Sequence, residues 1–185
     1  HWPSEGALGY SFPMLFAEYA KGYQAQYKLS DETLRTMLAH VAALGYRNGL
    51  QNPLAHFGKG GPADKLGLTT AEAILALPDE GRGSNPLIAA PLRLHDCSLV
   101  SDGAAAMVIA PTSDALTISK RVVEIAGIGM TTERMPENVR PNMYELIAAK
   151  RAVQQSFAEA GINIKDVDFA EVHDCFTINQ LLSTE

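Results

Sequence analysis

Three side chains that can titrate or donate a proton follow one another at His173, Asp174 and Cys175. They end an alternating, mostly apolar run from Val167 and precede a helical pattern, so the stretch Asp168–Leu182 predicts a strand, a tight turn and a helix. At the carboxyl end of a strand in an α/β sheet, side chains point into the crevice where ligands bind. The sequence therefore predicts an active site here, with a hydrogen-bonded turn around a packed Cys as the structural alternative.

The same tripeptide occurs once more as His95, Asp96 and Cys97. Histidine and cysteine are ligands that zinc accepts, but neither copy has the C-x-x-C or H-x-x-x-H spacing of known structural sites. We therefore predict no metal site. A disulfide between Cys97 and Cys175 is disfavoured, because two cysteines in 185 residues suit a reducing compartment. Turn chemistry alone explains the first copy, so a structural role is favoured for it.

A glycine-rich loop, Gly58–Gly61, contains Lys59 and has the composition of a phosphate cradle. It lacks the G-x-x-x-x-G-K-[ST] spacing, and no strand clearly precedes it. A flexible connector is the favoured interpretation.

Composition excludes several classes of protein. The chain is 46% hydrophobic and 19% charged, with a net charge of -6 and no long run of like charges. It therefore has neither a basic nucleic-acid footprint nor a polybasic membrane patch. No window approaches 18 consecutive apolar residues, so no membrane span is predicted. We expect small-molecule or protein partners in an intracellular compartment: the cytoplasm, or a peroxisome or mitochondrion in a eukaryote.

Periodicity predicts an α/β arrangement with a long irregular region. Ser30 is a candidate N-cap, Gly45 a candidate helix end and Gly161 a candidate C' residue. Residues 48–91 read mainly as loops. Strand, helix and strand in the last third form a βαβ unit with parallel strands. The predicted helices are 8–27, 30–45, 70–77 and 142–160, and the predicted strands are 104–110, 121–130 and 167–173.

Two passages together resemble the thiolase superfamily. DCSLVSDGAAAMVIA, at Asp96–Ala110, resembles the thiolase pattern D-C-x-x-x-S/T-D-G-A-A-A. EVHDCFTINQLL, at Glu171–Leu182, resembles the H-D-C-F loop of sterol carrier protein type thiolases. The resemblance implies a partial thiolase-like fold, layered α-β-α-β-α from two similar half-domains. It assigns 1–90 to the loop domain covering the active site, 91–118 to the end of the N-terminal half-domain, and 119–185 to the first half of the C-terminal one.

The resemblance also implies an activity. A thiolase-type acyltransferase would cleave 3-ketoacyl-CoA with coenzyme A, as in fatty acid β-oxidation, or run the reverse Claisen condensation. His173 would donate a hydrogen bond to a substrate oxygen, Asp174 would support the loop, Cys175 would be the acid/base, and Phe176 would pack the loop. No permanently bound cofactor or metal is implied; coenzyme A is a substrate. A homodimer or homotetramer, or a heteromeric partner, is expected.

Two alternatives stay open. One is a non-catalytic subunit or scaffold with a thiolase fold. The other is a thiolase-like carbon–carbon lyase that works by retro-aldol chemistry on an acyl-CoA such as a steroid side chain. The chain starts without Met and stops within a helical pattern, so we expect a middle-to-C-terminal piece. The family's nucleophilic Cys, its G-H-P histidine and its C-x-G loop would then lie outside these residues.

Overall fold

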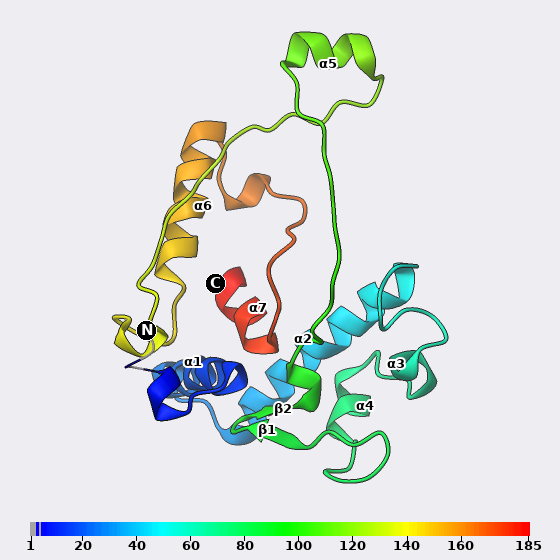
Figure 1. Ribbon diagram of the computed structural model, residues 1–185, viewed down its shortest axis with the longest axis vertical. Coiled ribbons are helices and arrows are strands. Elements are labelled where there is room, and N and C mark those ends of the chain that lie inside the picture. Colours follow the sequence, from blue (N-terminus) through cyan, green and yellow to red (C-terminus); the bar gives the residue numbers. More distant parts are fainter. Residues whose placement is uncertain (1–2, 4) are drawn as a thin grey trace. The chain divides into compact units, whose positions relative to one another are not determined.

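The computed structural model describes residue 3 and residues 5–185, which divide into two compact units (Figure 1). The first unit comprises the residues up to Ser98 together with Glu133–Leu146 and Glu171–Glu185. The second comprises Leu99–Thr132 and Ile147–Ala170. Both His-Asp-Cys tripeptides therefore belong to the first unit.

The first unit is built on two long helices, α1 (Phe12–Tyr27) and α2 (Asp31–Gln51), preceded by the short η1 (Gly6–Leu8). Proline near the start of α1 suits a position where the backbone N–H has no intrahelical partner. Helix α1 buries one face that is rich in aromatic residues. Its buried side chains are Phe16, Ala17, Tyr19, Ala20 and Tyr23.

Helix α2 starts where the sequence predicted and ends later. The Ser30 hydroxyl accepts a hydrogen bond from the Thr33 N–H at 3.1 Å, which satisfies one free donor of the first turn. The predicted end at Gly45 is wrong, because the helix continues to Gln51. Glycine inside a helix costs about 1 kcal/mol, whereas burying a large side chain contributes roughly 1.5–3 kcal/mol. The free energy gained by burying Tyr46, the next residue, therefore outweighs the helix-propensity cost of Gly45.

Short elements cover the other face of α2. Helices α3 (Pro62–Lys65) and α4 (Ala71–Leu75) pack against it, and Thr70 caps α4, which ends two residues before the predicted 77. A hairpin follows, β1 (Leu87–Ala89) and β2 (Leu92–Arg93), paired antiparallel. It leads directly into η2 (Leu94–Asp96), which carries the first His-Asp-Cys copy.

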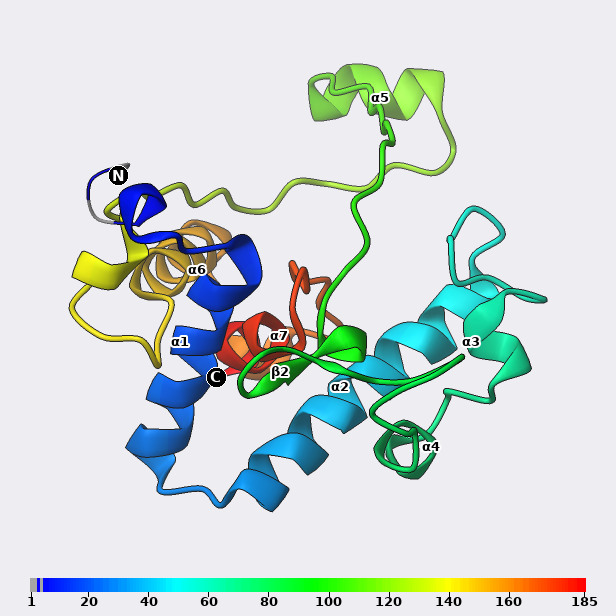
Figure 2. The ribbon, with the colours of Figure 1, turned by 60° about the horizontal axis from the view of Figure 1, so that its bottom comes forward.

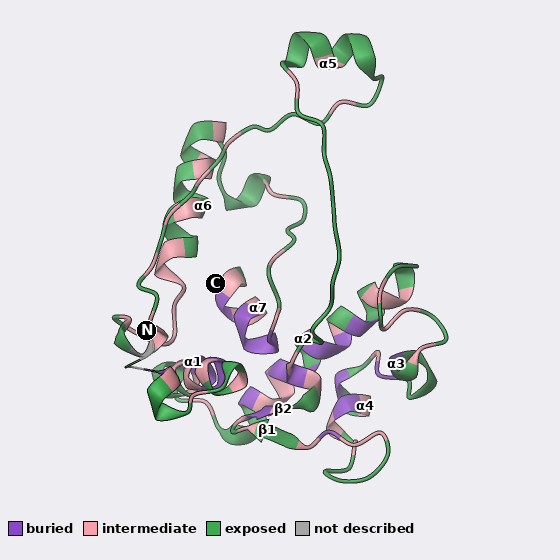
Figure 3. Cartoon of the chain, viewed as in Figure 1, coloured by how far each residue is buried: buried purple, intermediate pink, exposed green. Residues whose placement is uncertain are grey.

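The core of the first unit closes around α7 (Thr177–Thr184), which contacts both α1 and α2 (Figure 2). Figure 3 shows buried residues on these three helices. The unit also includes η3 (Glu137–Val139). The buried core cluster consists of Phe16, Ala17, Tyr19, Ala20, Tyr23, Leu34, Leu38, Leu92, Phe176, Ile178 and Leu182.

The second unit contains α5 (Thr112–Ile118), α6 (Ile147–Ala160) and η4 (Ile164–Asp166). Helix α6 starts five residues later than the predicted 142. Its predicted end is confirmed: Gly161 has φ +68°, and the Ile162 N–H donates to the Phe157 carbonyl at 3.1 Å.

The predicted strands 104–110, 121–130 and 167–173 do not pair within the described residues (Figure 1). A β-ladder requires backbone donors and acceptors from a neighbouring strand. Segment 128–131 instead follows α6, where the Ile128 N–H donates to Glu159 at 2.8 Å and the Met130 N–H donates to Gln155 at 3.2 Å. The period-two pattern therefore located these segments but not their partners.

Candidate active site

The second His-Asp-Cys copy lies on the loop that leads into α7. His173 and Asp174 are exposed, Cys175 is half-buried, and α7 begins two residues later. Phe176 is only 4% exposed and stacks on Phe16 of α1, with ring centroids 4.3 Å apart and an interplanar angle of 18°. This buried ring anchors the loop, which is the packing role predicted for Phe176.

The two copies of the tripeptide meet in the structure. Cys97 and Phe176 form an isolated antiparallel bridge, and the Ser98 N–H donates to the Cys175 carbonyl at 2.9 Å. The Asn179 side-chain amide donates to the His173 carbonyl. Hydrogen bonds to the loop's own carbonyls therefore hold it at His173 and at Cys175.

Asp96 of the first copy makes a buried polar contact with Thr177, which lies two residues after the second copy. Its Oδ1 accepts the Thr177 hydroxyl hydrogen at 2.9 Å, and its Oδ2 accepts the Arg93 N–H at 2.8 Å. Burial raises the pKa of the Asp96 carboxyl, although the Arg93 and Thr177 hydrogen bonds and the Arg35 charge act in the opposite direction. Loop support was predicted for Asp174, which is exposed. Sequence reasoning missed Asp96, and the repeated tripeptide was the one signal that could have indicated it.

His95 makes a separate contact with α2. The Tyr46 hydroxyl and His95 Nδ1 form a hydrogen bond, and the two rings meet edge-on at 5.7 Å. His95 Nε2 is buried without a partner in the described part of the chain. Burial lowers the pKa of His95 and raises that of Tyr46 to about 12, because it disfavours both charged forms.

Both cysteines are free thiols whose pKa values are raised by burial. Burial and the neighbouring Asp96 charge raise the pKa of Cys97 to about 11, and its Sγ donates to the Arg93 carbonyl at 3.4 Å. For Cys175, burial is the largest cause, and the Asp174 charge adds to it. A protonated Cys175 suits a proton donor better than a nucleophile. The catalytic roles of His173, Asp174 and Cys175 stay predictions.

A metal site would need several ligands on one centre. Within residue 3 and residues 5–185, no group of three or more His, Cys, Asp or Glu side chains could hold an ion.

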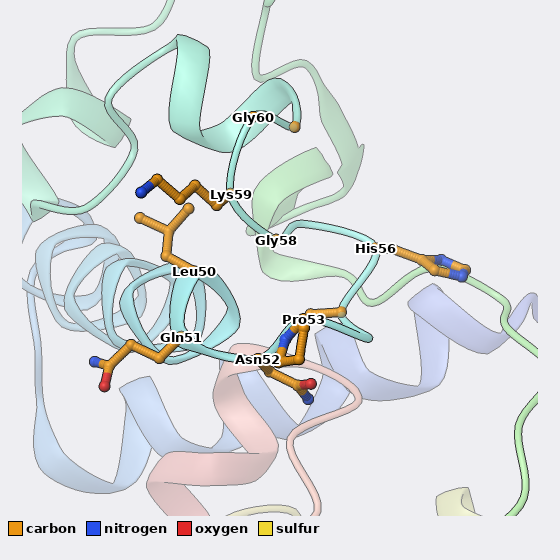
Figure 4. A pocket seen from close by; sticks show the side chains of 10 residues that line it. Leu50, Gln51, Asn52, Pro53, His56, Gly58, Lys59 and Gly60 are labelled. Carbon is orange, nitrogen blue, oxygen red and sulfur yellow. The ribbon is translucent and has the colours of Figure 1, made fainter.

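The Gly58–Gly61 loop has the composition of a phosphate cradle. A surface pocket of about 580 Å³ lies beside this loop. In Figure 4 the side chains of Lys59 and His56 point away from one another. The loop's own chain already uses the N–H groups of Gly58, Gly60 and Gly61, with Ala55, Asp64 and Gly58 as acceptors. This favours the connector interpretation.

Comparison with known proteins gives the same family. Residues 129–185 match the sequence family described as thiolase C-terminal domain-like. The acetyl-CoA acetyltransferase of Methanocaldococcus jannaschii is 33% identical over 183 residues, which cover 98% of this chain and 42% of that protein. Sterol carrier protein 2 of Rattus norvegicus is 26% identical over 181 residues, covering 94% of this chain and 29% of that protein.

The fold likeness extends along the chain. A solved structure titled Ltp2-ChsH2(DUF35) aldolase superposes with a TM-score of 0.78 over 98% of this chain and 44% of that chain, at 23% identity. These matches show a likeness to thiolases along almost the whole chain. The predicted resemblance to thiolases and the predicted partial thiolase-like fold are thus confirmed. The chain spans 42% of the length of its archaeal acetyltransferase relative.

The predicted domain boundaries at 90 and 118 stay predictions. The first thiolase-like passage, Asp96–Ala110, runs from the first unit into the second at Leu99. Among the described residues, no helix is both long and apolar enough to cross a bilayer.

Proposed function

We propose that this chain is part of a thiolase-type acyltransferase acting on 3-ketoacyl-CoA, of the sterol carrier protein type. The main support is the H-D-C-F loop, in which Phe176 is buried, Cys175 is half-buried and His173 stays exposed beside it. The acetyltransferase name of the archaeal relative agrees with this class of reaction. Coenzyme A is then a substrate, and no resident cofactor is proposed.

In the thiolytic direction, a nucleophilic thiolate attacks the 3-keto carbon, and the bond between C2 and C3 breaks. By family resemblance that thiolate lies outside these residues. The electron pair stays on C2 of the leaving acetyl-CoA, where it needs a proton. Cys175 supplies this proton from its thiol, whose raised pKa keeps it protonated. His173 donates a hydrogen bond to the substrate oxygen on which negative charge collects.

Coenzyme A completes the cycle. Its thiol gives a proton to the Cys175 thiolate and attacks the acyl-enzyme, which releases a shortened acyl-CoA and restores the nucleophile. Cys175 is thus acid in one half-reaction and base in the other, and its proton is restored in each turnover.

The test replaces each cysteine of the described pair in the whole natural protein. Cys175→Ala should lower the turnover of acetoacetyl-CoA thiolysis by roughly 10²- to 10⁴-fold, because a general acid/base is lost, with little change in Tm. Cys97→Ala is the matched control, since Cys97 is also half-buried but plays no part in the proposed step. It should keep near-normal turnover and lose about 1 kcal/mol of stability. Near-normal turnover in Cys175→Ala would exclude the catalytic role.

A carbon–carbon lyase is the second candidate, because the superposed structure is titled an aldolase. Its 23% identity carries the fold alone, so acyl transfer remains the main proposal. The segment preceding the printed residues separates the two: a C-x-S nucleophile loop supports acyl transfer, and a Tyr there supports retro-aldol cleavage. Loss of every polar group there would support a scaffold.

A further inference from the structure

The hydrogen bond between Asp96 and Thr177 joins the first tripeptide to the residues just after the second, and both side chains are buried. Asp96 is 9% exposed and Thr177 is 6% exposed, and their side chains are hydrogen-bonded at 2.9 Å across 81 residues of sequence. Burying a carboxylate and a hydroxyl costs free energy unless both are paired. Two apolar side chains of similar size would fill the same space without that cost.

This contact acts directly on the loop that carries Cys175. Thr177 is the first residue of α7, and Cys175 lies two residues before it. Two backbone contacts also hold the residues in between. Cys97 forms a bridge with Phe176, and the Ser98 N–H donates to the Cys175 carbonyl, so the segment after Asp96 contacts the backbone before Thr177. Few backbone torsions therefore remain free between the anchored Thr177 and the Cys175 thiol.

Asp96 is itself fixed. Its second carboxylate oxygen accepts the Arg93 N–H, and Arg93 is the last residue of β2 in the β1–β2 hairpin. The carboxylate also lies at the N-terminal end of α7, where a negative charge is stabilised by the helix dipole. The hairpin, Asp96 and the start of α7 thus form one connected support.

We propose that Asp96 and Thr177 are positioning residues, which hold the loop so that Cys175 and His173 meet the reacting carbon and oxygen. This inference rests on the proposed acyltransferase function. Neither residue needs to touch substrate. We call the Asp96–Thr177 hydrogen bond the clamp. Because the clamp positions Cys175 and His173 in the chemical step, its loss should lower kcat and leave the KM for coenzyme A nearly unchanged.

The experiment compares Thr177→Val with Thr177→Ser in the whole natural protein. Valine keeps the shape and removes the hydroxyl, whereas serine keeps the hydroxyl donor to Asp96. Thr177→Val should lower kcat roughly 10- to 100-fold, the size expected when a catalytic group moves by about 1 Å. Thr177→Ser should stay within about threefold of the natural protein, and both should show similar KM for coenzyme A.

A second measurement does not depend on activity. Alkylation by iodoacetamide, followed peptide by peptide by mass spectrometry, compares Cys175 with Cys97 in the same sample. Loosening the loop should raise the Cys175 rate roughly fivefold in Thr177→Val, and the Cys97 rate less than about twofold. General unfolding would raise both rates together. If Thr177→Val does not fold, Thr177→Ala removes the same hydroxyl without adding a methyl group to the pocket.

The outcomes separate the two proposals. If the valine and serine variants have equal kcat and equal Cys175 alkylation, the positioning role is overturned. If the natural protein shows no acyl transfer, the proposed function fails. The alkylation ratio still decides whether Asp96 and Thr177 hold the loop, with a raised ratio supporting the clamp and an unchanged ratio overturning it.

Discussion

Burial moves the pKa values of two adjacent residues, His95 and Asp96, in opposite directions. It lowers the pKa of His95 and raises that of Asp96, because in each case the charged form loses hydration. The same physics keeps the Cys175 thiol protonated. The partly buried surroundings of the loop therefore disfavour the charged forms of His95, Asp96 and Cys175.

This shift predicts how stability depends on pH. The folded protein holds His95 with a pKa below its ordinary 6.5, so the unfolded chain binds more protons just below that pH. Stability from His95 should thus fall as the pH drops below 6.5, until the lowered folded pKa is passed. Asp96 has the opposite sign: its ionisation weakens the fold as pH rises from 3.8 through its raised pKa.

The His95→Gln variant isolates the histidine contribution. Urea unfolding at pH 7.5, 6.5 and 5.5 should show a shallower loss of stability toward low pH than in the natural sequence, because glutamine does not titrate. Asp96 is unchanged in both proteins, so its contribution cancels in the comparison. Identical slopes in the two proteins would show that His95 is not held neutral.

Residue types revealed the loop, but not its support. His173, Asp174 and Cys175 stand out in the sequence because three reactive side chains are adjacent. The pairing of Asp96 with Thr177 spans 81 residues and leaves no periodic trace, so the repeated tripeptide was the one sequence signal for it. Long-range polar pairs depend on how the elements pack, which local patterns do not encode.

At the scale of elements, helices were predicted far better than strands. Ser30 and Gly161 marked helix ends correctly, because capping uses neighbouring residues of the same segment. The end predicted at Gly45 was wrong, since tertiary burial of Tyr46 overrides propensity. Strand formation needs a partner outside the segment, and pattern alone supplies none.

The packing of segment 121–130 on α6 gives a prediction for two glycines. A Cβ at Gly129 would overlap the Ala152 carbonyl of α6, whereas a Cβ at Gly45 has nothing within 4 Å. Gly129→Ala should therefore destabilise the protein by roughly 1–3 kcal/mol through overpacking. Gly45→Ala should stabilise it by about 0.5–1 kcal/mol, because alanine favours the helix interior.

Thermal unfolding of both variants checks this prediction, with Gly45→Ala as the matched substitution. A lower Tm for Gly129→Ala and a raised Tm for Gly45→Ala are expected. Equal Tm values for Gly129→Ala and the natural sequence would mean that the segment does not approach α6 closely.

At the scale of the whole molecule, two short motifs predicted the family and the fold, which composition and periodicity could not. The thiolase fold is a layered structure whose strands pair across long stretches of chain. In the described residues, the one sheet is the two-stranded hairpin β1–β2. The layers could be predicted by resemblance only, because 104–110 and 121–130 are unpaired within residue 3 and residues 5–185.

Hydrogen exchange tests whether the segments that the thiolase resemblance predicts as strands are paired in this chain. Val108 is 97% exposed and Val123 is 92% exposed, and no strand partner lies within the described residues. In the 185-residue chain studied alone, amides of 104–110 and 121–126 should exchange near the unprotected rate, while those in the middle of α1 and α2 exchange far more slowly. In a polypeptide of the relatives' full length we expect these segments to pair with other strands, so the same peptides should be protected. Strong protection of 104–110 in the 185-residue chain would show that it finds a partner strand within these residues, and the unpaired arrangement would then be wrong.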